Sequence, residues 1–533
     1  MDQTTRPSHR VPGARIDALV IGAGIGGLAT AARLSQAGLR VTVLERHAHP
    51  GGKMRTVPSP AGPVDAGPTV LTMRPVFDTL FSALGTRLED HVELVPQQIL
   101  ARHFWPDGST LDLHADQDAS CAAITAFAGP RAADQFCRFC TRARTLFDGF
   151  EGPVMQAPAP RPLALAAHVL KRPALAVAMR PLSTLADLCA HSFDDPRLAQ
   201  LFGRYATYVG GSPYDVPALL SLIWQAEMAG VWVVRGGVSA LARSIANLAE
   251  DRGAEIRLNT HVDRIVVQSG RATGVVLADG AHLQADHIVF NGDPRALATG
   301  CLGAGLHAAA PQTARLPRAL SAEVWAFAAT PEGHDLAHHN VFFRADPKPE
   351  FDALAAGRRV ADPTLYVCAM DRGLPEQPPA LERFEIIANA PPLRPGGQEE
   401  EFARCQTRTF KTLEQHGLRF SPGPGPAALT TPYMFDRLFP GSCGSLYGQS
   451  PHGTMAAFRR PVAQTRIRGL FLAGGGAHPG AGVPMATLSG QHAAAAILRA
   501  RTSTSRSRPT ATRGGTSTAS ATTTGAPSRS LPS

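Results

Sequence analysis

The sequence predicts an α/β protein in which a domain built on a parallel β-sheet is interrupted by a second, mixed α+β domain. Near its start, at residues 16–45, an apolar run, a glycine-rich turn, a helical pattern and a second apolar run follow one another. Residues 470–498 show the order strand, glycine loop and helix again. The full length of 533 residues exceeds what one hydrophobic core usually organises, so two domains are expected.

The first segment has the order of a complete β-α-β unit that binds a dinucleotide. Residues 16–21 are typical of a buried parallel strand, and Gly22, Gly24 and Gly27 follow with G-x-G-x-x-G spacing. The spacing assigns a tight turn to Gly22, close approach of backbone to pyrophosphate to Gly24, and close helix–strand packing to Gly27. The phosphates then lie at the amino end of the following helix.

The second strand of this unit ends at Glu45. A carboxylate at that position accepts hydrogen bonds from ribose hydroxyls and disfavours a 2′-phosphate. Because strand, turn, helix, second strand and terminal acid occur in order, dinucleotide binding is favoured over a purely structural glycine turn.

The residues after Glu45 indicate which dinucleotide binds. Residues 46–55, R-H-A-H-P-G-G-K-M-R, place Gly51 and Gly52 shortly after the acid and follow them with cations. This segment resembles the flavin-binding pattern of the amine oxidase and carotenoid desaturase superfamily. The resemblance implies that the diglycine lets the chain pass close to FAD and that Lys53 or Arg55 meets phosphate or flavin charge. A glycine loop with solvated cations is the alternative.

Composition disfavours several classes of function. The net charge is +9, but residues 501–533 hold five arginines and no acid, which leaves +4 for residues 1–500. Without an aromatic-interleaved basic motif, nucleic-acid binding has little support. The eight cysteines are scattered and no secretory signal opens the chain, so a reduced intracellular setting is expected. The longest uncharged stretch, within residues 470–498, holds six glycines and two prolines, so no transmembrane helix is expected.

Two pairs of residues have metal-ligand spacing without completing a site. Cys137 and Cys140 have no second cysteine pair, so two helix-borne thiols are favoured. His334 and His338 have no obvious third ligand, so histidines of a surface loop are favoured. The sequence therefore predicts no metal.

The next segments predict a ligand loop and a hairpin. Residues 64–71, V-D-A-G-P-T-V-L, predict a short loop and strand. Asp65, Gly67 and Pro68 suit a tight backbone turn against a ligand, although an ordinary turn has the same composition. Residues 101–114 predict a hairpin around a Pro-Asp-Gly turn.

Residues 116–222 are alanine-rich and helical in pattern, and residues 161–180 stand out among them. This shorter segment is strongly apolar and lacks acids, and its cations are Arg161, Lys171, Arg172 and Arg180. A membrane-surface segment has this composition, because apolar side chains enter the interface while cations meet anionic headgroups. A helical hairpin of the substrate domain with cationic turns fits equally well.

The chain then returns to the first domain. Residues 230–250 predict a strand, a Gly-Gly turn and an amphipathic helix, and residues 262–290 predict further strands. Residues 324–328 and 364–370 predict strands of the second domain, and a helix is expected near 398–416.

The last glycine-rich element predicts a helix that begins near Val483. A flavoprotein needs such an element, because the amino end of the helix faces the flavin carbonyls and glycines such as Gly474 and Gly475 let backbone touch the ring system. Two distant glycine-rich elements in one chain favour FAD more strongly than either alone.

We therefore expect four regions. They are a polar leader at residues 1–15, a discontinuous FAD-binding domain at 16–115, 223–300 and 440–500, a substrate and membrane-facing domain at 116–222 and 301–439, and a disordered tail at 501–533.

Separated motifs together carry a resemblance to one family. They are the block G-A-G-I-G-G…L-E-R-H…P-G-G-K-M-R-T with A-G-P-V-D-A-G-P-T-V-L-T-M, then E-M-A-G-V-W-V-V-R-G-G, L-F-P-G-S-C-G-S-L-Y-G and A-H-P-G-A-G-V-P-M-A. Over about residues 16–499 the chain resembles the bacterial phytoene-desaturase family of FAD enzymes. Residues 52–73 are most similar to its 1-hydroxycarotenoid 3,4-desaturases, also called methoxyneurosporene dehydrogenases. Related enzymes often have a small hydroxyl residue where this chain has Ala477.

The resemblance implies a Rossmann-like FAD-binding domain of the amine-oxidase and phytoene-desaturase type with an inserted mixed α+β substrate domain. It implies that a carotenoid polyene lies in a dry tunnel against FAD, the acceptor of two hydrogens. The residues expected at the cofactor are Gly22, Gly24, Gly26, Gly27, Glu45, Arg46, Gly51, Gly52, Lys53, Met54, Arg55, Gly67, Pro68, Thr69, Val262, Gly474, Gly475, Val483 and Met485.

A base for the second hydrogen is not obvious from the sequence. Glu227 and His478 lie in family motifs and are the candidate catalytic residues. In the alternative structural roles, Glu227 only caps or pairs, and His478 only braces the flavin loop.

The expected activity is introduction of a C3–C4 double bond into 1-hydroxy- or 1-methoxy-carotenoids. Oxygen or a membrane quinone then reoxidises the flavin, with the protein peripheral on the cytoplasmic face of the inner membrane. The alternatives are a phytoene desaturase, a carotenoid isomerase that uses reduced flavin, and a non-catalytic carotenoid-binding protein with structural FAD. An amine oxidase is disfavoured because nothing in the second domain suggests an amine site. A substrate hydroxyl would need a polar partner in an otherwise apolar tunnel.

Overall fold

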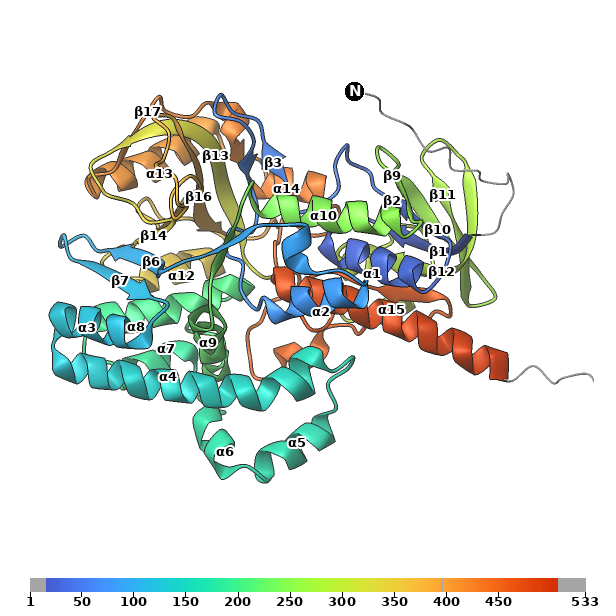
Figure 1. The fold of residues 1–533 in the computed structure, drawn as a ribbon, viewed down its shortest axis with the longest axis horizontal. Coiled ribbons are helices and arrows are strands. Elements are labelled where there is room, and N and C mark those ends of the chain that lie inside the picture. Colours follow the sequence, from blue (N-terminus) through green and yellow to red (C-terminus); the bar gives the residue numbers. More distant parts are fainter. Residues whose placement is uncertain (1–15, 395, 507–533) are drawn as a thin grey trace, which may run out of the picture.

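The structure, a computed structural model, describes residues 16–394 and 396–506. It has two lobes, each organised by one β-sheet, and the chain crosses between them several times (Figure 1). This architecture confirms the predicted α/β fold class with an inserted mixed domain. The predicted leader and residues 507–533 of the predicted tail lie outside the described residues.

The first lobe is built on a seven-stranded sheet. Parallel strands β12, β1, β2 and β9 form its centre, β19 pairs in parallel with β12, and antiparallel β11 and β10 extend it. The strands are β1 Ile16–Ile21, β2 Val41–Leu44, β9 Glu255–Arg257, β10 Val262–Gln268, β11 Arg271–Leu277, β12 His282–Phe290 and β19 Leu470–Leu472.

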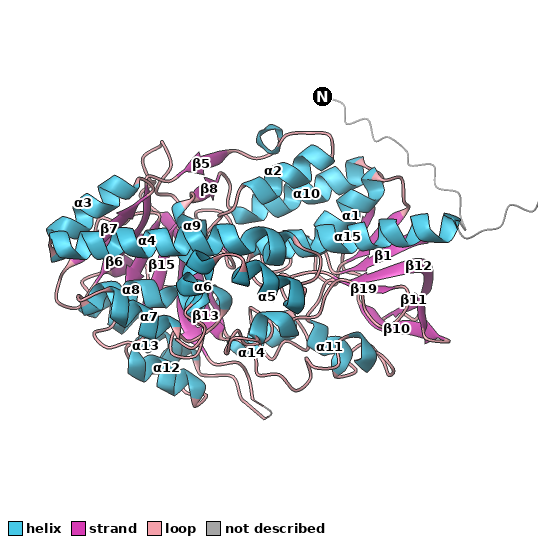
Figure 2. Cartoon of the chain, turned by 90° about the horizontal axis from the view of Figure 1, so that it is seen from below, coloured by secondary structure: helices cyan, strands magenta, loops and turns pink. Residues whose placement is uncertain are grey.

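Four helices cover one face of this sheet (Figure 2): α1 Ile25–Gln36, α2 Pro75–Ala83, α10 Val238–Asp251 and α15 Val483–Arg506. Successive side chains of a strand point to opposite faces. Ala18 and Val20 therefore pack with the helices, whereas Leu19 and Ile21 pack with strands β10 and β11 on the other face.

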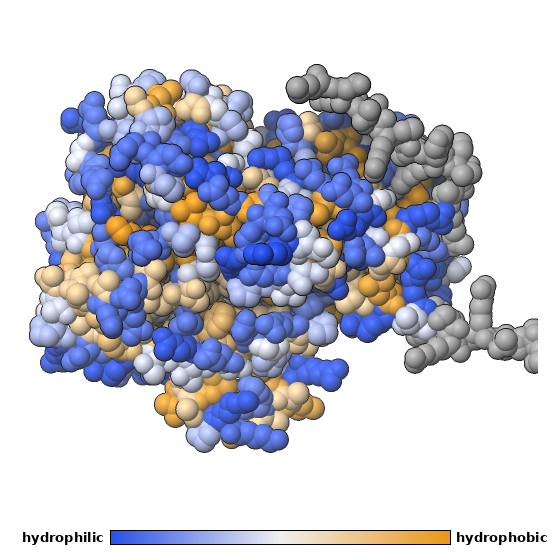
Figure 3. All heavy atoms as spheres, viewed as in Figure 1, coloured by the Kyte–Doolittle hydropathy of each residue, from blue (hydrophilic) through white to orange (hydrophobic). Residues whose placement is uncertain are grey.

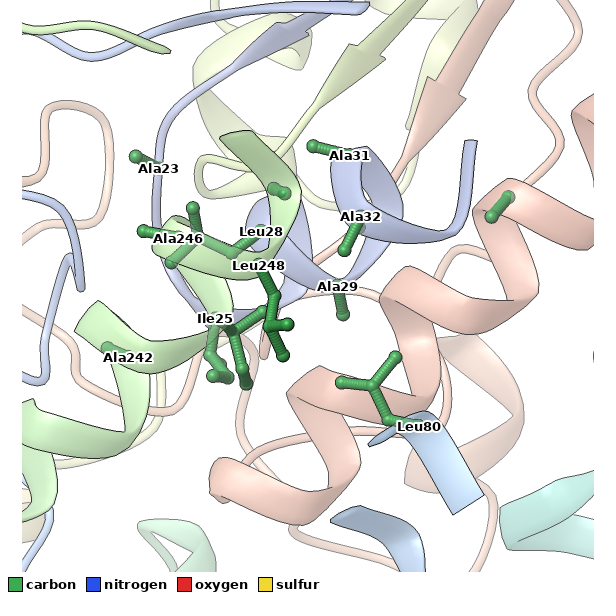
Figure 4. Packing of buried hydrophobic residues seen from close by; sticks show 14 of the residues in the cluster. Ala23, Ile25, Leu28, Ala29, Ala31, Ala32, Leu80, Ala242, Ala246 and Leu248 are labelled. Carbon is green, nitrogen blue, oxygen red and sulfur yellow. The ribbon is translucent and has the colours of Figure 1, made fainter. Parts of the chain in front are cut away.

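Small residues let α1 lie close to its neighbours. Ile25, Leu28 and the alanines of α1 meet α10 and α2 in one apolar cluster (Figure 4). A Cβ on Gly490 of α15 would lie 2.1 Å from the Gly26 carbonyl oxygen, and Thr30 Oγ1 donates to the Gly490 carbonyl at 3.0 Å. This contact fixes the amino end of α15 beside the glycine turn of α1.

The second lobe is built on an eight-stranded sheet in the order β17, β13, β16, β15, β14, β6 and β7, with β18 paired to β13. All neighbouring pairs are antiparallel except β14 with β6. The strands are β6 Ile99–Phe104, β7 Thr110–His114, β13 Ser321–Glu332, β14 His339–Phe342, β15 Leu365–Ala369, β16 Glu382–Ala390, β17 Arg419–Ser421 and β18 Leu429–Thr430.

Helices pack on both faces of the second sheet. On one face Phe136, Phe202 and Trp224 form an aromatic cluster with Val324 and its neighbours, while Trp325 of the same strand packs under α13 on the other face. The helices are α3 Gln117–Ala128, α4 Pro130–Phe150, α7 Leu185–Ser192, α8 Pro196–Gly203, α9 Leu222–Met228, α12 Lys348–Ala355 and α13 Phe402–Gln415.

The remaining elements are short. They are α5 Pro162–Leu170, α6 Pro173–Met179, α11 Pro294–Ala298, α14 Pro432–Leu438, the pair β3 Thr56–Val57 with β4 Val64–Asp65, and the pair β5 Leu94–Pro96 with β8 Trp232–Val234. Within residues 16–506, no described helix is both long and apolar enough to cross a membrane.

Three expected boundaries differ from the structure. The hairpin β6–β7 belongs to the second sheet, not to the FAD-binding domain, because β6 pairs with β14. Helix α9 also belongs to the second lobe, since Trp224 lies in its core. Helix α15 runs to Arg506, beyond the expected end at residue 500, because no glycine or proline interrupts the chain there.

Candidate cofactor and substrate site

A cavity of about 500 Å³ lies between the two lobes. Its wall comes at one end from the glycine-rich loops of the first lobe and at the other from the second sheet and α14. The wall is predominantly apolar. Such a cavity suits a dinucleotide at its glycine-rich end and a lipophilic molecule beyond it.

The glycine turn after β1 lines one end of the cavity. Gly22 has a φ of +96°, which favours glycine, and its N–H donates to the Leu44 carbonyl at 2.8 Å. A Cβ on Gly24 would lie 2.9 Å from Asn291 Nδ2, and one on Gly27 would lie 2.2 Å from the Gly22 carbonyl oxygen. Gly22, Gly24 and Gly26 line the cavity, while Gly27 packs α1 against the turn.

Asn291, just after β12, holds this turn in place. Its Nδ2 donates to the carbonyls of Gly22 at 3.0 Å and Gly24 at 3.2 Å. Its Oδ1 is buried without a hydrogen-bond partner among the described residues, and the side chain lines the cavity. Asn291 is not among the residues expected from the sequence, although a polar N-G-D run directly after an apolar strand is a usable signal.

Glu45 lies at the end of β2 on the cavity wall. Its Oε2 accepts from the Ala23 N–H at 2.7 Å and its Oε1 from the His47 N–H at 2.9 Å. These bonds fix a carboxylate beside the glycine turn. Arg46 and Val262 line the same end.

The diglycine loop lies against the glycine turn. The Gly51 N–H donates to the Ala23 carbonyl at 2.8 Å, and a Cβ on Gly52 would lie 3.0 Å from the Gly24 Cα. Gly51, Gly52, Lys53 and Met54 line the cavity. The buried Lys53 ammonium donates to the Leu446 carbonyl, and burial lowers its pKa to about 8.

Arg55 is not on the cavity wall, contrary to the expectation that it meets the cofactor. Its Nη2 donates to Thr430 Oγ1 and its guanidinium carbon lies 5.8 Å from the Phe435 ring centroid. The chain turns after Met54, so the second cation of the motif points into the second lobe. Of the two candidate cations, only Lys53 reaches the cavity.

The loop after β4 contributes Gly67, Pro68 and Thr69 to the wall. A Cβ on Gly67 would lie 1.9 Å from the Lys53 carbonyl oxygen, so only glycine lets this loop lie against the diglycine loop. Asp65 instead caps α10, accepting from the Val238 and Ser239 N–H groups.

The last glycine loop closes this end of the cavity. Gly474 has a φ of +93° and its N–H donates to Ser489 Oγ at 2.7 Å. Gly474, Gly475 and Val483, the first residue of α15, line the cavity. Met485 does not, because helical side chains two positions apart point in different directions, and Ala486 lies on the wall instead.

The other end of the cavity is lined by the second lobe. Its wall residues include Arg204, Tyr208, Val324, Tyr366, Ile387, Phe435, Phe439, Leu446 and Tyr447. Most of these side chains are apolar or aromatic, so this half excludes water and suits a long hydrocarbon.

Comparison with known proteins decides the family. Residues 25–498 match the profile of the flavin-containing amine oxidoreductases. The chain belongs to this family. The match runs from the end of the first glycine turn through the second lobe and the last glycine-rich element, so the protein is a flavin-dependent oxidoreductase with FAD as its cofactor.

Individual proteins are similar to this flavin oxidoreductase to different degrees. Hydroxyneurosporene desaturase of Cereibacter sphaeroides is 55% identical over 488 residues, which is 92% of this chain and 98% of that one. Phytoene desaturase (lycopene-forming) of Pseudescherichia vulneris is 31% identical over 496 residues, covering 90% and 98%. The solved structure of cyclohexylamine oxidase from Brevibacterium oxydans has a TM-score of 0.56 at 18% identity, covering 92% and 100%. The last likeness shows the shared fold.

The cavity of this flavin oxidoreductase fits FAD on structural grounds. A Cβ on Gly24 would lie 2.9 Å from Asn291 Nδ2 and one on Gly52 would lie 3.0 Å from the Gly24 Cα, so both loops expose bare backbone along the wall. The amino ends of α1 and α15 point unpaired N–H groups toward the same space. Glu45 and Lys53 add an acceptor at one end and a cation at the other.

Neither candidate catalytic residue lines the cavity. Glu227, on α9, is 2% exposed, and its Oε1 accepts from the Tyr205 O–H at 2.7 Å. Burial raises the pKa of this carboxyl. His478 Nε2 donates to the Ala157 carbonyl at 2.9 Å, so it braces the flavin loop against the segment before α5. These positions do not support direct contact of either side chain with a substrate.

The polar residues of the substrate half had no signal in the sequence. Arg204 and Tyr208 come from a short helical turn and Tyr366 from a central strand, and only the fold brings them to one wall. The guanidinium carbon of Arg204 lies 5.5 Å from the ring centroid of Tyr208 and 5.6 Å from that of Tyr366.

The predicted surface location is wrong for His338, which is 6% exposed. Its Nδ1 donates to the Arg372 carbonyl at 2.7 Å, and its Nε2 lies 3.5 Å from the Cys368 thiol. The chain pairs β14 with β15 here, which buries the loop that precedes β14. Cys137 and Cys140 both lie on α4.

Proposed function

We propose that this flavin oxidoreductase introduces a C3–C4 double bond into 1-hydroxy- or 1-methoxy-carotenoids. The observation that carries the proposal is its much greater identity with a hydroxyneurosporene desaturase than with a phytoene desaturase, each over nearly the full length of the relative. The predominantly apolar second half of the cavity agrees with a long polyene substrate.

The chemistry requires a two-electron acceptor and a dry, oriented substrate. A C–H bond allylic to a polyene carries no acidic proton, and FAD, when bound, supplies the acceptor for the two hydrogens. The residues of the chain supply position and surroundings. Gly24, Gly52 and Gly67 give the cofactor bare backbone, while Val324 and Ile387 exclude water from the space beyond it.

The assay that tests the proposal uses the purified yellow holoprotein and candidate carotenoids. A desaturase lengthens the conjugated system, so the carotenoid absorption shifts to longer wavelength while the flavin is bleached in the absence of an acceptor. A carotenoid isomerase changes mainly the band shape, and a carotenoid-binding protein changes neither. Either of the last two results contradicts the proposal.

Peripheral attachment to an anionic membrane is the second part of the proposal. Helices α5 and α6 project from the second lobe, and their tip carries apolar side chains on its surface (Figures 1 and 3). Leu163 is 88% exposed, Leu170 81%, Val177 72% and Leu182 100%. Exposed apolar residues beside Lys171 and Arg172 are what a membrane interface binds. We place this surface on the cytoplasmic face of the inner membrane, where a lipophilic carotenoid is supplied.

Membrane attachment also bears on how the flavin is reoxidised. Oxygen and a membrane quinone are both proposed acceptors. Stopped-flow measurement of the reduced holoprotein on quinone-containing anionic vesicles, with and without oxygen, distinguishes them by which addition restores the yellow flavin.

A further inference from the structure

A line of hydrogen-bonded side chains reaches the cavity wall from the second sheet. The Tyr366 hydroxyl on β15 lies 2.7 Å from Thr69 Oγ1, and both residues line the cavity. On its other side the same hydroxyl lies 2.6 Å from Nδ1 of His339 on β14. Two hydroxyl groups therefore connect a buried imidazole with the space between the lobes.

The buried end of this line is neutral. His339 is 2% exposed, and burial holds its pKa well below the ordinary value of 6.5. A neutral imidazole has one N–H and one bare nitrogen. Its Nε2 has no hydrogen-bond partner among the described residues, and its Nδ1 is hydrogen-bonded to the Tyr366 hydroxyl.

Both directions of the line leave Thr69 with hydrogen-bonding capacity at the cavity. If Nδ1 donates to Tyr366 and Tyr366 donates to Thr69, the Thr69 O–H is free to donate into the cavity. If instead Thr69 donates to Tyr366 and Tyr366 donates to Nδ1, Thr69 Oγ1 keeps lone pairs that can accept a hydrogen bond from a group in the cavity. A substrate hydroxyl satisfies either arrangement, whereas a hydrocarbon end satisfies neither.

The position of this line matches the position of the reaction. Thr69 follows Gly67, whose backbone lies against the Lys53 carbonyl at the flavin end of the cavity. The carotenoid carbon that carries the hydroxyl, C1, is separated from C3 by only one carbon, so the group that binds the hydroxyl must lie near the carbons that react. The neighbouring wall residues Val324 and Ile387 are apolar. The line therefore lies among few polar groups of the wall, one of which is Arg204, whose guanidinium carbon lies 5.6 Å from the Tyr366 ring centroid.

We propose that Thr69 and Tyr366, positioned by His339, bind the terminal hydroxyl of the carotenoid and select hydroxylated ends over hydrocarbon ends. This inference rests on the proposed function and names its specificity-determining residues. A hydroxylated carotenoid end loses its hydrogen bonds to water on binding and makes new ones to these side chains. A hydrocarbon end leaves a hydroxyl group of the wall without a hydrogen-bond partner.

The test compares the holoenzyme and its Thr69→Val and Tyr366→Phe variants on 1-hydroxyneurosporene and on neurosporene. The ratio of kcat/KM for the hydroxylated over the hydrocarbon substrate should fall roughly tenfold in each variant, the worth of one net hydrogen bond, mainly through KM for the hydroxylated substrate. Thr69→Ser keeps the hydroxyl and should keep the wild-type ratio.

A matched control is Thr412→Val, which makes the same atom change at a buried threonine of α13 that does not line the cavity. The Thr412 hydroxyl donates to the Arg408 carbonyl at 2.8 Å, away from the substrate, so this variant should keep the substrate ratio. FAD content and melting temperature of each variant show whether it folds and holds the cofactor.

Three outcomes overturn the inference. Variants that retain FAD and the wild-type ratio show that the line does not recognise the hydroxyl. Loss of FAD from Thr69→Val with an unchanged ratio in the reconstituted enzyme shows that the hydroxyl serves the cofactor. If the wild type converts no carotenoid at all, the proposed function fails and this inference fails with it.

Discussion

At the residue scale, the cofactor end of the cavity is shaped mainly by glycines, which have no side chain. A Cβ on Gly24, Gly52 or Gly67 would lie no more than 3.0 Å from an atom of a neighbouring segment. Asn291 then ties the first of these loops to β12 through two hydrogen bonds. Backbone approach thus depends on both the glycines and the amide that holds them.

Gly24→Val tests this dependence directly. The new side chain collides with Asn291 Nδ2 and fills the path of the pyrophosphate, so the purified variant should contain almost no FAD. Flavin absorbance per protein measures the occupancy. Gly203→Ala is the control, because its Cβ meets only Pro213 at 3.7 Å, and it should remain yellow. A fully yellow Gly24→Val protein would refute the assignment.

Glu227→Gln tests whether the buried carboxyl is protonated. Its pKa is raised above the ordinary 4.5, so its contribution to stability is greatest at low pH and declines as pH rises above 4.5. Glutamine keeps an acceptor for Tyr205 and does not ionise. The melting temperature of the variant minus that of the wild type should therefore increase from pH 5 to pH 8. A difference that stays constant over this range would mean that the carboxyl titrates normally.

Residues whose roles depend on the local backbone could be predicted from the sequence. Residues that distant strands bring together could not. The glycine turn and Glu45 are visible because their spacing is local. Tyr366 meets Thr69 across 297 positions of the chain, and no local pattern encodes that contact. Met485 and Arg55 do not line the cavity, because the phase of a helix and the direction of a loop depend on tertiary packing.

At the element scale, the α5–α6 pair differs from the other helices in how many large apolar side chains it exposes to solvent. Leu163 and Leu170 of α5 are exposed, whereas Leu175 of α6 is buried, and the segment before α5 is joined to the flavin loop through the bond from His478 to Ala157. The sequence of residues 161–180 fits both a membrane-surface segment and a helical hairpin of the substrate domain. The structure has a helical hairpin with an exposed apolar tip, which is compatible with both.

Flotation with anionic liposomes tests the membrane role of this pair. Each cation near an anionic surface contributes about 1 kcal/mol, so neutralising Lys171 and Arg172 together should weaken binding roughly 30-fold at low salt. The control neutralises Arg404 and Lys411 on α13, two exposed cations of another element, and should leave binding unchanged. Salt-insensitive binding that survives the Lys171 and Arg172 changes would place the contact elsewhere.

The elements themselves were largely predictable, but their partners were not. The hairpin at residues 101–114 was expected from its turn, and the structure has it as β6 and β7. Its membership in the second sheet depends on β14, more than 230 positions later in the chain. Pairing over such distances has no local sequence signal, which explains the misplaced boundary.

At the scale of the whole molecule, two sheets enclose one cavity, with bare backbone at one end and an apolar wall at the other. The chain passes between the lobes several times (Figure 1), and both lobes contribute to the cavity wall. The glycine-rich end belongs to the family fold shared with amine oxidases, whereas the other end is lined by residues of the second lobe.

Expression in cells of defined carotenoid content tests the central claim most directly. One host accumulates 1-hydroxyneurosporene and a matched host accumulates only phytoene, and the pigments are separated and their spectra recorded. The account predicts a product with one more conjugated double bond from the hydroxylated substrate and little change to phytoene. Efficient conversion of phytoene with no change to 1-hydroxyneurosporene would contradict it.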